Sequence, residues 1–561
     1  MGVYITKTLL GLIFPVFLLS INPQDLTHSP NNILYVNPAA GEIRLRVKMN
    51  TVDKATLILK KNVIAMQSAF SDGGYDYFLA TTTPFDSTAG YFFVLKYGND
   101  TLIYPAGETL YARVPYYTTP EWAKGISYYS IFLDGFYNGL SDNDRPPSQA
   151  WESSPKPWHS YGGDLRGLIT KIPYLDSLNI DAVIIQPITL ASSNHKYNAR
   201  EYSLVDSAFG DTLVLKDAIN QLHNRDIKVL MSLVFTHTGN DFAAFNDVIT
   251  NQLASRYANW YLVDSWPIKT SPPSYQCWLN DHRFPRLNLA NSQVINYAIG
   301  YVEYWRHFGF DGFYIGENES IDPLFAKMLR NYVKPKAQNI LLIGSDDRLI
   351  SGYGFDGMRN KNLTNLLRDF FIDRKLSVSE FDLSYRRLLF FKPPQVNTIN
   401  LISVSDFSGR FWKDDHDDLV RLMFAFIFTS VGSPVLFYGD EVGYRKAVFL
   451  NPGSFPWDAN NQDRILYYDI QSLIEIRRNN PQLRSSNFYP LYVNDINRVY
   501  AYDRGGIIIA LNCDNNPSYI ELPAWNGTYI DLINGEKIFV SLQKLRITVE
   551  ARSFRILKRE I

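Results

Sequence analysis

The chain has 561 residues, 46% of them hydrophobic and 20% charged, which is the composition of a globular protein and the length of several domains. Its formal net charge of −1 leaves no basic excess to neutralise phosphates, and so argues against a nucleic-acid-binding protein. Two cysteines, Cys277 and Cys513, are too few for a disulfide scaffold.

The N-terminus carries a short apolar run. Lys7 precedes a stretch of mostly apolar residues from Leu9 to Ile21, which has the layout of a secretory signal and is too short for a full membrane span. We therefore predict that residues 1–24 form a signal peptide or a short membrane anchor. The protein is then expected to be extracellular or on the cell surface, with membrane contact through this segment only.

Three stretches of different periodicity follow. Residues 30–117 alternate apolar and polar side chains, as is typical of a β-sandwich. Between 118 and 486, strand-like runs such as 227–235 alternate with helical patterns such as 215–225, which predicts a (β/α)8 barrel of parallel strands. Alternation returns over 487–561. The predicted fold is α/β, a barrel flanked by an N-terminal and a C-terminal β-sandwich domain.

Several phrases within the predicted barrel carry a family resemblance. They are Pro120–Asp134, Ser193–Asn198, Phe284–Asn288, Phe437–Glu441, Phe455–Asp458 and Gln462–Arg464. Through them the chain resembles the α-amylase family of glycoside hydrolases (family 13), and most closely its neopullulanase and cyclomaltodextrinase branch. The resemblance implies a carbohydrate-binding-like N-terminal domain, and retaining hydrolysis of α-glucans by two carboxyl groups about 5–5.5 Å apart.

The positions that the resemblance assigns to catalysis carry unexpected residues. The nucleophile position at the end of the fourth strand is Gly316, and the general-acid position at the end of the fifth is Ser345. Glycine has no nucleophilic group, and a serine hydroxyl is too weak an acid to protonate a glycosidic oxygen. Asp406 is the only family acid retained. Three further positions are also replaced, by Ser232, Tyr314 and Ser405.

Three functions are weighed on this basis. The favoured one is an exported pseudoenzyme that binds α-glucan or maltodextrin, or serves as a surface scaffold. The alternative is an active α-glucan hydrolase with displaced carboxylates, in which Glu317 or Glu319 replaces the nucleophile and Asp346 or Asp347 replaces the general acid. In an extended strand a shift of one residue turns a side chain to the opposite face, although a bulge can re-aim it. A third reading is an interaction or structural protein without sugar binding.

The resemblance also implies a sugar-binding group. His195, Tyr197, His237 and Asp406 match positions that line the family's sugar site. Two residues lie beside them in the sequence, Asn198 and Tyr202. Hydroxyl-bonding side chains with aromatic faces suit a glucan.

A structural Ca²⁺ ion and a homodimer are further implications of the resemblance. Oxygen ligands suit calcium, although Leu140 replaces one expected aspartate, and a metal-free turn is the alternative. The matching positions are Asn138, Asn143, Asp144, Gly162 and Asp164. The homodimer is expected to form through the N-terminal domain.

Overall fold

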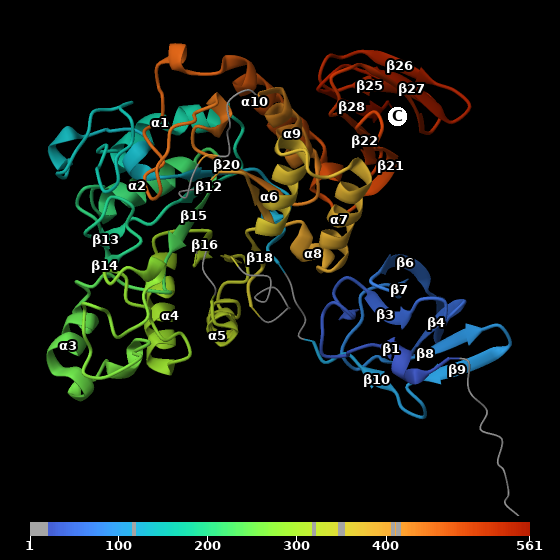
Figure 1. The fold of residues 1–561 in the computed structure, drawn as a ribbon, viewed down its shortest axis with the longest axis horizontal. Helices are drawn as coiled ribbons and strands as arrows, with labels where there is room; N and C mark the ends of the chain where they lie inside the picture. Colours follow the sequence, from blue (N-terminus) through green and yellow to red (C-terminus); the bar gives the residue numbers. More distant parts are fainter. Residues whose placement is uncertain are drawn as a thin grey trace, which may run out of the picture. The chain divides into compact units, whose positions relative to one another are not determined.

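The computed structural model describes residues 21–114, 119–316, 321–345, 354–405, 410 and 417–560 (Figure 1). The chain divides into two compact units, one ending at Tyr116 and the other beginning at Tyr117. Residues 1–20 of the predicted signal segment lie outside the described part. Within that part, no helix combines the length and apolar character needed to cross a membrane.

The first unit is a β-sandwich of two antiparallel sheets. One sheet contains β1 (Leu26–Thr27), β2 (Val36–Asn37), β3 (Glu42–Lys48), β6 (Gln67–Asp72) and β7 (Tyr75–Thr81). The other contains β4 (Lys54–Leu59), β5 (Asn62–Ala65), β8 (Gly90–Tyr97), β9 (Asp100–Tyr104) and β10 (Leu110–Tyr111). Leu45 and Val47 of one sheet share a core with Leu57 and Phe93 of the other, because alternate side chains of each strand face inward.

The second unit contains a barrel of eight parallel strands. In order around the barrel these are β11 (Tyr128–Ile131), β12 (Ala182–Ile185), β15 (Lys228–Leu233), β16 (Gly312–Ile315), β17 (Leu341–Gly344), β18 (Gly357–Met358), β19 (Leu401–Ser403) and β20 (Ser433–Phe437). β20 pairs with β11, and a parallel bridge from Arg359 to Leu401 links the region of β18 to β19, so the sheet closes. Because all strands run the same way, their carboxyl ends meet at one mouth.

Helices connect and cover the barrel strands. They are α1 (Leu165–Ser177), α2 (Thr212–His223), α4 (Ser292–Arg306), α5 (Pro323–Val333), α6 (Lys361–Leu367), α7 (Val378–Phe390), α8 (Pro394–Asn397), α9 (Asp417–Thr429) and α10 (Arg464–Asn479). α3 (Ala243–Asn251) lies in an insertion after β15, and the hairpin of β13 (Thr189–Ala191) and β14 (Ala199–Val205) follows β12. Asp164 and Asp211 accept backbone amide hydrogens at the starts of α1 and α2, which explains why those helices begin there.

The chain ends in a second β-rich region packed on the barrel helices. Six strands form one sheet: β21 (Tyr489–Asn494), β22 (Val499–Asp503), β23 (Ile507–Asn512), β25 (Gly527–Asp531), β26 (Lys537–Val540) and β28 (Ser553–Arg559). β24 (Ser518–Pro523) pairs with β27 (Lys544–Val549). The Tyr500 hydroxyl donates to Asp382 of α7 at 2.8 Å, which ties this region to the barrel. The predicted fold class, an amylase-like barrel between two β-rich regions, is confirmed.

Candidate active site

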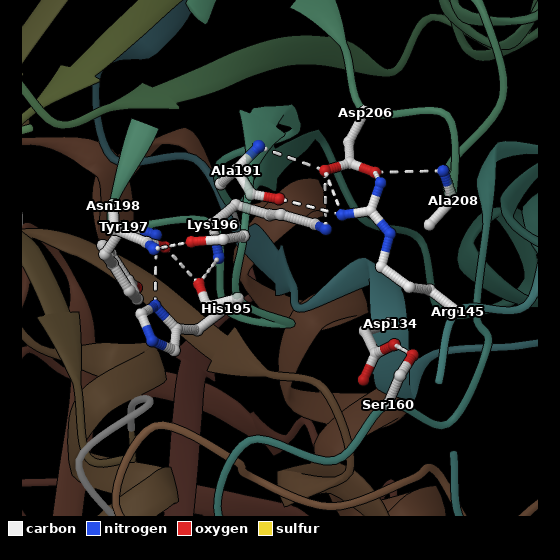
Figure 2. Close-up of polar contacts among 12 residues, drawn as sticks. Asp134, Arg145, Ser160, Ala191, His195, Lys196, Tyr197, Asn198, Asp206 and Ala208 are labelled. Atoms are coloured by element: carbon white, nitrogen blue, oxygen red, sulfur yellow. Dashed lines mark hydrogen bonds and ion pairs between the residues drawn. The ribbon is translucent and has the colours of Figure 1, made fainter. Parts of the chain in front are cut away.

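A buried ion pair holds the loop between β13 and β14 in place (Figure 2). Nζ of Lys196 lies 2.8 Å from Oδ2 of Asp206, and these side chains are 3% and 0% exposed. Arg145 reaches the other carboxylate oxygen at 3.2 Å, and the backbone amides of Ala191 and Ala208 donate to the same carboxylate. Although burial opposes it, the Lys196 ammonium holds the pKa of Asp206 below its usual value. The ion pairs of Asp206 with Lys196 and Arg145 therefore hold the loop between β13 and β14 in place.

The same loop presents His195 as a neutral hydrogen-bond donor. Its Nδ1 accepts the backbone N–H of Tyr197 at 3.1 Å, so the ring proton lies on Nε2. Nε2 is buried and has no partner within the part of the chain that the structure describes. Burial, and then the positive charge of Lys196, hold the pKa of His195 well below its usual value. The hydroxyl of Tyr197 donates to Gln186 at 3.0 Å and sets the neighbouring ring.

Aromatic rings surround His195 and His237. The ring of Trp278 stacks on His237 with centroids 4.6 Å apart and planes at 12°, and Phe284 meets His237 edge-on at 5.6 Å. Trp158 meets His195 edge-on at 5.0 Å. Burial lowers the pKa of His237 to about 3, so this imidazole is neutral as well. Tyr197, Trp278 and Phe284 belong to one buried apolar cluster, and both histidines lie against its Phe284 ring.

Asn198 and Tyr202 make their polar contacts inside the protein. The Asn198 amide accepts a hydrogen bond from Ser193 and donates to Ser192 at 2.7 Å. The Tyr202 hydroxyl donates to the carbonyl of Val234 at 2.6 Å. The structure thus gives both residues a role in holding the backbone on which the two histidines lie.

The ends of β16 and β17 are joined through Gly316 and Ser345. The Ser345 hydroxyl donates to the Gly316 carbonyl at 2.7 Å, and the Gly316 amide donates to the carbonyl of Leu233 at 3.0 Å. Gly316 has φ +68°, and a Cβ there would lie 2.2 Å from Cδ1 of Ile321. This backbone conformation favours glycine, and a side chain here would also have to displace the tip of Ile321.

The neighbouring replaced positions lie within the barrel. Ser232 and Tyr314 are register partners on β15 and β16, and both are buried. Ser405 is buried beyond the end of β19. The acids Glu317, Asp346 and Asp406 lie outside the described residues.

The residues of the predicted calcium site lie close together and fit a cation in part. The Asn138 amide donates to both carboxylate oxygens of Asp144, at 2.9 and 3.1 Å, and a Cβ on Gly162 would lie 2.2 Å from Asp144 Oδ1. Oδ1 of Asn143 is buried without a partner in the described chain, as a ligand oxygen would be. Asp164, by contrast, accepts the backbone amide hydrogens of Gly167 at the start of α1 and of Leu140 in the preceding loop. Among described residues, no group of three or more His, Cys, Asp or Glu side chains could hold a metal.

Inspection of the sequence missed several residues of this region. Lys196 lies between His195 and Tyr197 in the sequence. A lysine flanked by two ring side chains of a candidate site could have suggested that it is buried with a carboxylate partner. Trp158 and Trp278 come from separate loops and share no spacing with the histidines, so no local pattern marks them.

A closed parallel barrel with polar and aromatic side chains gathered on its loops defines the class, a (β/α)8 barrel protein of the kind that carries its site at the strand ends. Residues 130–331 match the family model for the catalytic domain of alpha amylase. The chain is 31% identical to a cyclomaltodextrinase of Geobacillus thermopakistaniensis over 91% of this chain and 95% of that protein. The chain therefore belongs to the α-amylase family.

Other relatives cover the chain to a similar extent. Neopullulanase 2 of Thermoactinomyces vulgaris is 28% identical over 90% of this chain and 94% of that protein. A solved cyclomaltodextrinase structure matches with a TM-score of 0.85 and 25% identity, covering 96% of this chain and all of that chain.

These comparisons contradict the prediction of an inactive glucan-binding scaffold. Relatives that match over 90% or more of the chain are named as a cyclomaltodextrinase, a neopullulanase and a maltogenic alpha-amylase, which supports the alternative of an active α-glucan hydrolase. The prediction rested on the missing carboxyl groups at Gly316 and Ser345. It also treated the fourth strand as extended through position 316, so that neighbouring acids would face away. The left-handed φ of Gly316 removes that premise.

Proposed function

We propose that this protein is an α-glucan hydrolase of the cyclomaltodextrinase or neopullulanase type. The observation that carries the proposal is the 31% identity with a cyclomaltodextrinase over 91% of the chain. Its substrate class is α-glucans or maltodextrins, the class that the relatives' names indicate.

Displaced carboxylates supply the chemistry in this proposal. Glu317 follows Gly316 and acts as nucleophile, and Asp346 follows Ser345 and acts as general acid. Two features support the assignment. The left-handed backbone at Gly316 interrupts the alternation of an extended strand, and the hydrogen bond from Ser345 to Gly316 joins the strand ends that precede both acids. Asp406, the acid that matches the family, holds substrate hydroxyls.

The described side chains bind and orient the glucan. His195 donates from Nε2 to a sugar hydroxyl and does so as a neutral imidazole, because burial keeps its pKa low. The rings around His237 provide apolar surface and exclude water. Binding by neutral donors does not depend on pH across the neutral range.

Further parts of the proposal concern the protein's surroundings. Asn143 and Asp144 would hold a structural Ca²⁺, supported by the unpaired Oδ1 of Asn143. The N-terminal unit would form a homodimer interface. Export through the N-terminal apolar run stays a prediction.

Release of reducing sugar from maltoheptaose, a cyclodextrin and pullulan tests the proposal. The purified full chain should hydrolyse at least one of them, and Glu317→Gln and Asp346→Asn should each lower kcat by about 10³-fold or more. Neighbouring variants Glu319→Gln and Asp347→Asn are the matched controls and should keep most activity. Absence of sugar release by the natural chain, or full activity in Glu317→Gln, would overturn the proposal.

A further inference from the structure

Trp158 has a backbone conformation that bulky residues avoid. Its φ is +64°, in the left-handed region that favours glycine or asparagine. Its loop is nevertheless tethered from two sides. The buried amide of Asn451 donates to the carbonyls of Lys156 and His159 at 2.8 and 3.0 Å, and Asn194 donates to the His159 carbonyl at 3.0 Å. The protein thus holds a tryptophan where the backbone disfavours it, and such strain concentrates at functional positions.

The indole of Trp158 is positioned from several directions. It meets His195 edge-on at 5.0 Å and lies nearly parallel to Phe284, with centroids 6.2 Å apart and planes at 20°. The Arg283 guanidinium lies 4.2 Å above the ring and is itself held by Asp281 at 2.6 Å. The ring is half-buried. Its orientation is therefore set by the protein while part of its surface faces solvent.

The N–H of this indole is not used by the fold. It makes no hydrogen bond to another described residue, which is also true of Trp266, Trp278 and Trp525. Tryptophans that do donate to a protein acceptor are Trp122, Trp151, Trp260, Trp305 and Trp457. Trp158 also packs against the buried cluster that contains Tyr197, Trp278 and Phe284, so its ring serves the fold while its N–H stays available to a ligand.

A second unpaired donor lies directly beside this ring. Nε2 of His195 carries the proton, is buried, and has no partner in the described chain. A buried donor without an acceptor costs free energy, and a bound hydroxyl would recover it. A pyranose ring offers hydroxyl oxygens at its edge and apolar C–H faces.

We infer that Trp158 is a specificity-determining residue that packs against one glucose ring of the substrate, while His195 binds a hydroxyl of the same sugar. The inference rests on the proposed function for its substrate class. On this inference, Trp158 keeps an unfavourable left-handed backbone because its ring contacts the sugar.

The experiment compares Trp158→Asn with Trp158→Phe and the control Trp151→Asn in the full chain. Asparagine relieves the left-handed strain at position 158. We expect KM for maltoheptaose to rise about tenfold in Trp158→Asn, with kcat changed less and the Tm unchanged or higher. Trp158→Phe should retain most of the affinity. Trp151 lies in the same loop and donates to the Phe455 carbonyl at 3.0 Å, so Trp151→Asn should lower the Tm and leave KM unchanged.

The outcomes separate this inference from the proposed function. If the natural chain hydrolyses no glucan, calorimetric Kd values for maltoheptaose replace KM, and a weakened Kd in Trp158→Asn supports the inference although the proposed function fails. An unchanged KM or Kd, or no binding of millimolar maltoheptaose by the natural chain, overturns the inference. A Tm loss in Trp158→Asn as large as in Trp151→Asn also overturns it, because the tryptophan would then be structural.

Discussion

On the β12 side of the barrel, the loop that carries His195 is held by charge, through Lys196 and Asp206. At the ends of β16 and β17 the described chain is held by backbone geometry, through the left-handed Gly316 and its bond from Ser345. Charges buried in pairs are costly to separate, whereas a neutral hydrogen bond contributes little net stability. The loop that carries His195 should therefore respond strongly to single substitutions, and the ends of β16 and β17 (the strand-end side) should respond more weakly.

Asp206→Asn should have the largest effect, because it leaves the Lys196 ammonium buried without its counter-charge. We expect a loss of about 3–5 kcal/mol in the free energy of unfolding, measured by denaturant titration. The control is Glu560→Gln, which removes an exposed ion pair with Lys537 and should cost about 1 kcal/mol or less. Equal losses in the two variants would show that the buried Lys196–Asp206 pair stabilises the protein no more than an exposed pair does.

The second prediction concerns Glu441, a buried carboxyl that follows β20. Whereas a lysine ammonium holds Asp206, neutral tyrosine hydroxyls hold Glu441. Tyr129 and Tyr174 donate to it at 2.6 and 2.7 Å, and burial raises its pKa to about 7. Its usual pKa is 4.5, so between pH 4.5 and 7 the unfolded chain releases this proton while the folded chain retains it. Stability should then fall as pH rises through this window, by on the order of 3 kcal/mol, and level off above pH 7.

Glu441→Gln should remove that part of the pH dependence, measured as unfolding free energy at pH 4.5 and 8. Asp134, whose pKa burial raises to about 6, contributes a fall of the same sign that the variant keeps. The same slope in variant and natural chain would show that Glu441 titrates normally.

Gly316→Ala tests the strand-end side. The new Cβ would be forced against Ile321 at a left-handed φ, and we expect a loss of about 2 kcal/mol. Gly300→Ala is the matched control, since Gly300 lies in α4 with no heavy atom within 4 Å of the added Cβ. That variant should gain about 0.5–1 kcal/mol. A neutral Gly316→Ala would mean that the left-handed turn is not required.

Ser345→Ala should have the smallest effect, because the bond from its hydroxyl to the Gly316 carbonyl joins neutral groups. The expected loss is about 1 kcal/mol in unfolding free energy. Ser153→Ala, which removes an exposed contact to the Ala150 carbonyl, provides the reference. A lowered kcat with unchanged KM in Ser345→Ala would indicate that the bond also positions the catalytic strand ends.

Much of the fold was predictable because periodicity and family phrases are local. Alternation marked the two β-rich regions, and strand-helix repeats marked the barrel. The phrase Ser193–Asn198 brought His195 and Tyr197 into the candidate site. The structure links Tyr197 to His237 through the ring of Trp278, and His195 to His237 through the ring of Phe284. A match to the family in six consecutive residues thus indicated which side chains lie near one another in the structure.

The sequence by itself determined the barrel, its flanking β-rich regions, the family and the histidines of the site, because each depends on residue types at fixed spacings. It also showed the missing carboxylates at 316 and 345, but not how the backbone runs there. Only the tertiary structure decided that Gly316 is left-handed, that Lys196 finds Asp206, and that Trp158 lies against His195. A dihedral angle and a long-range contact depend on packing between segments that no local pattern encodes.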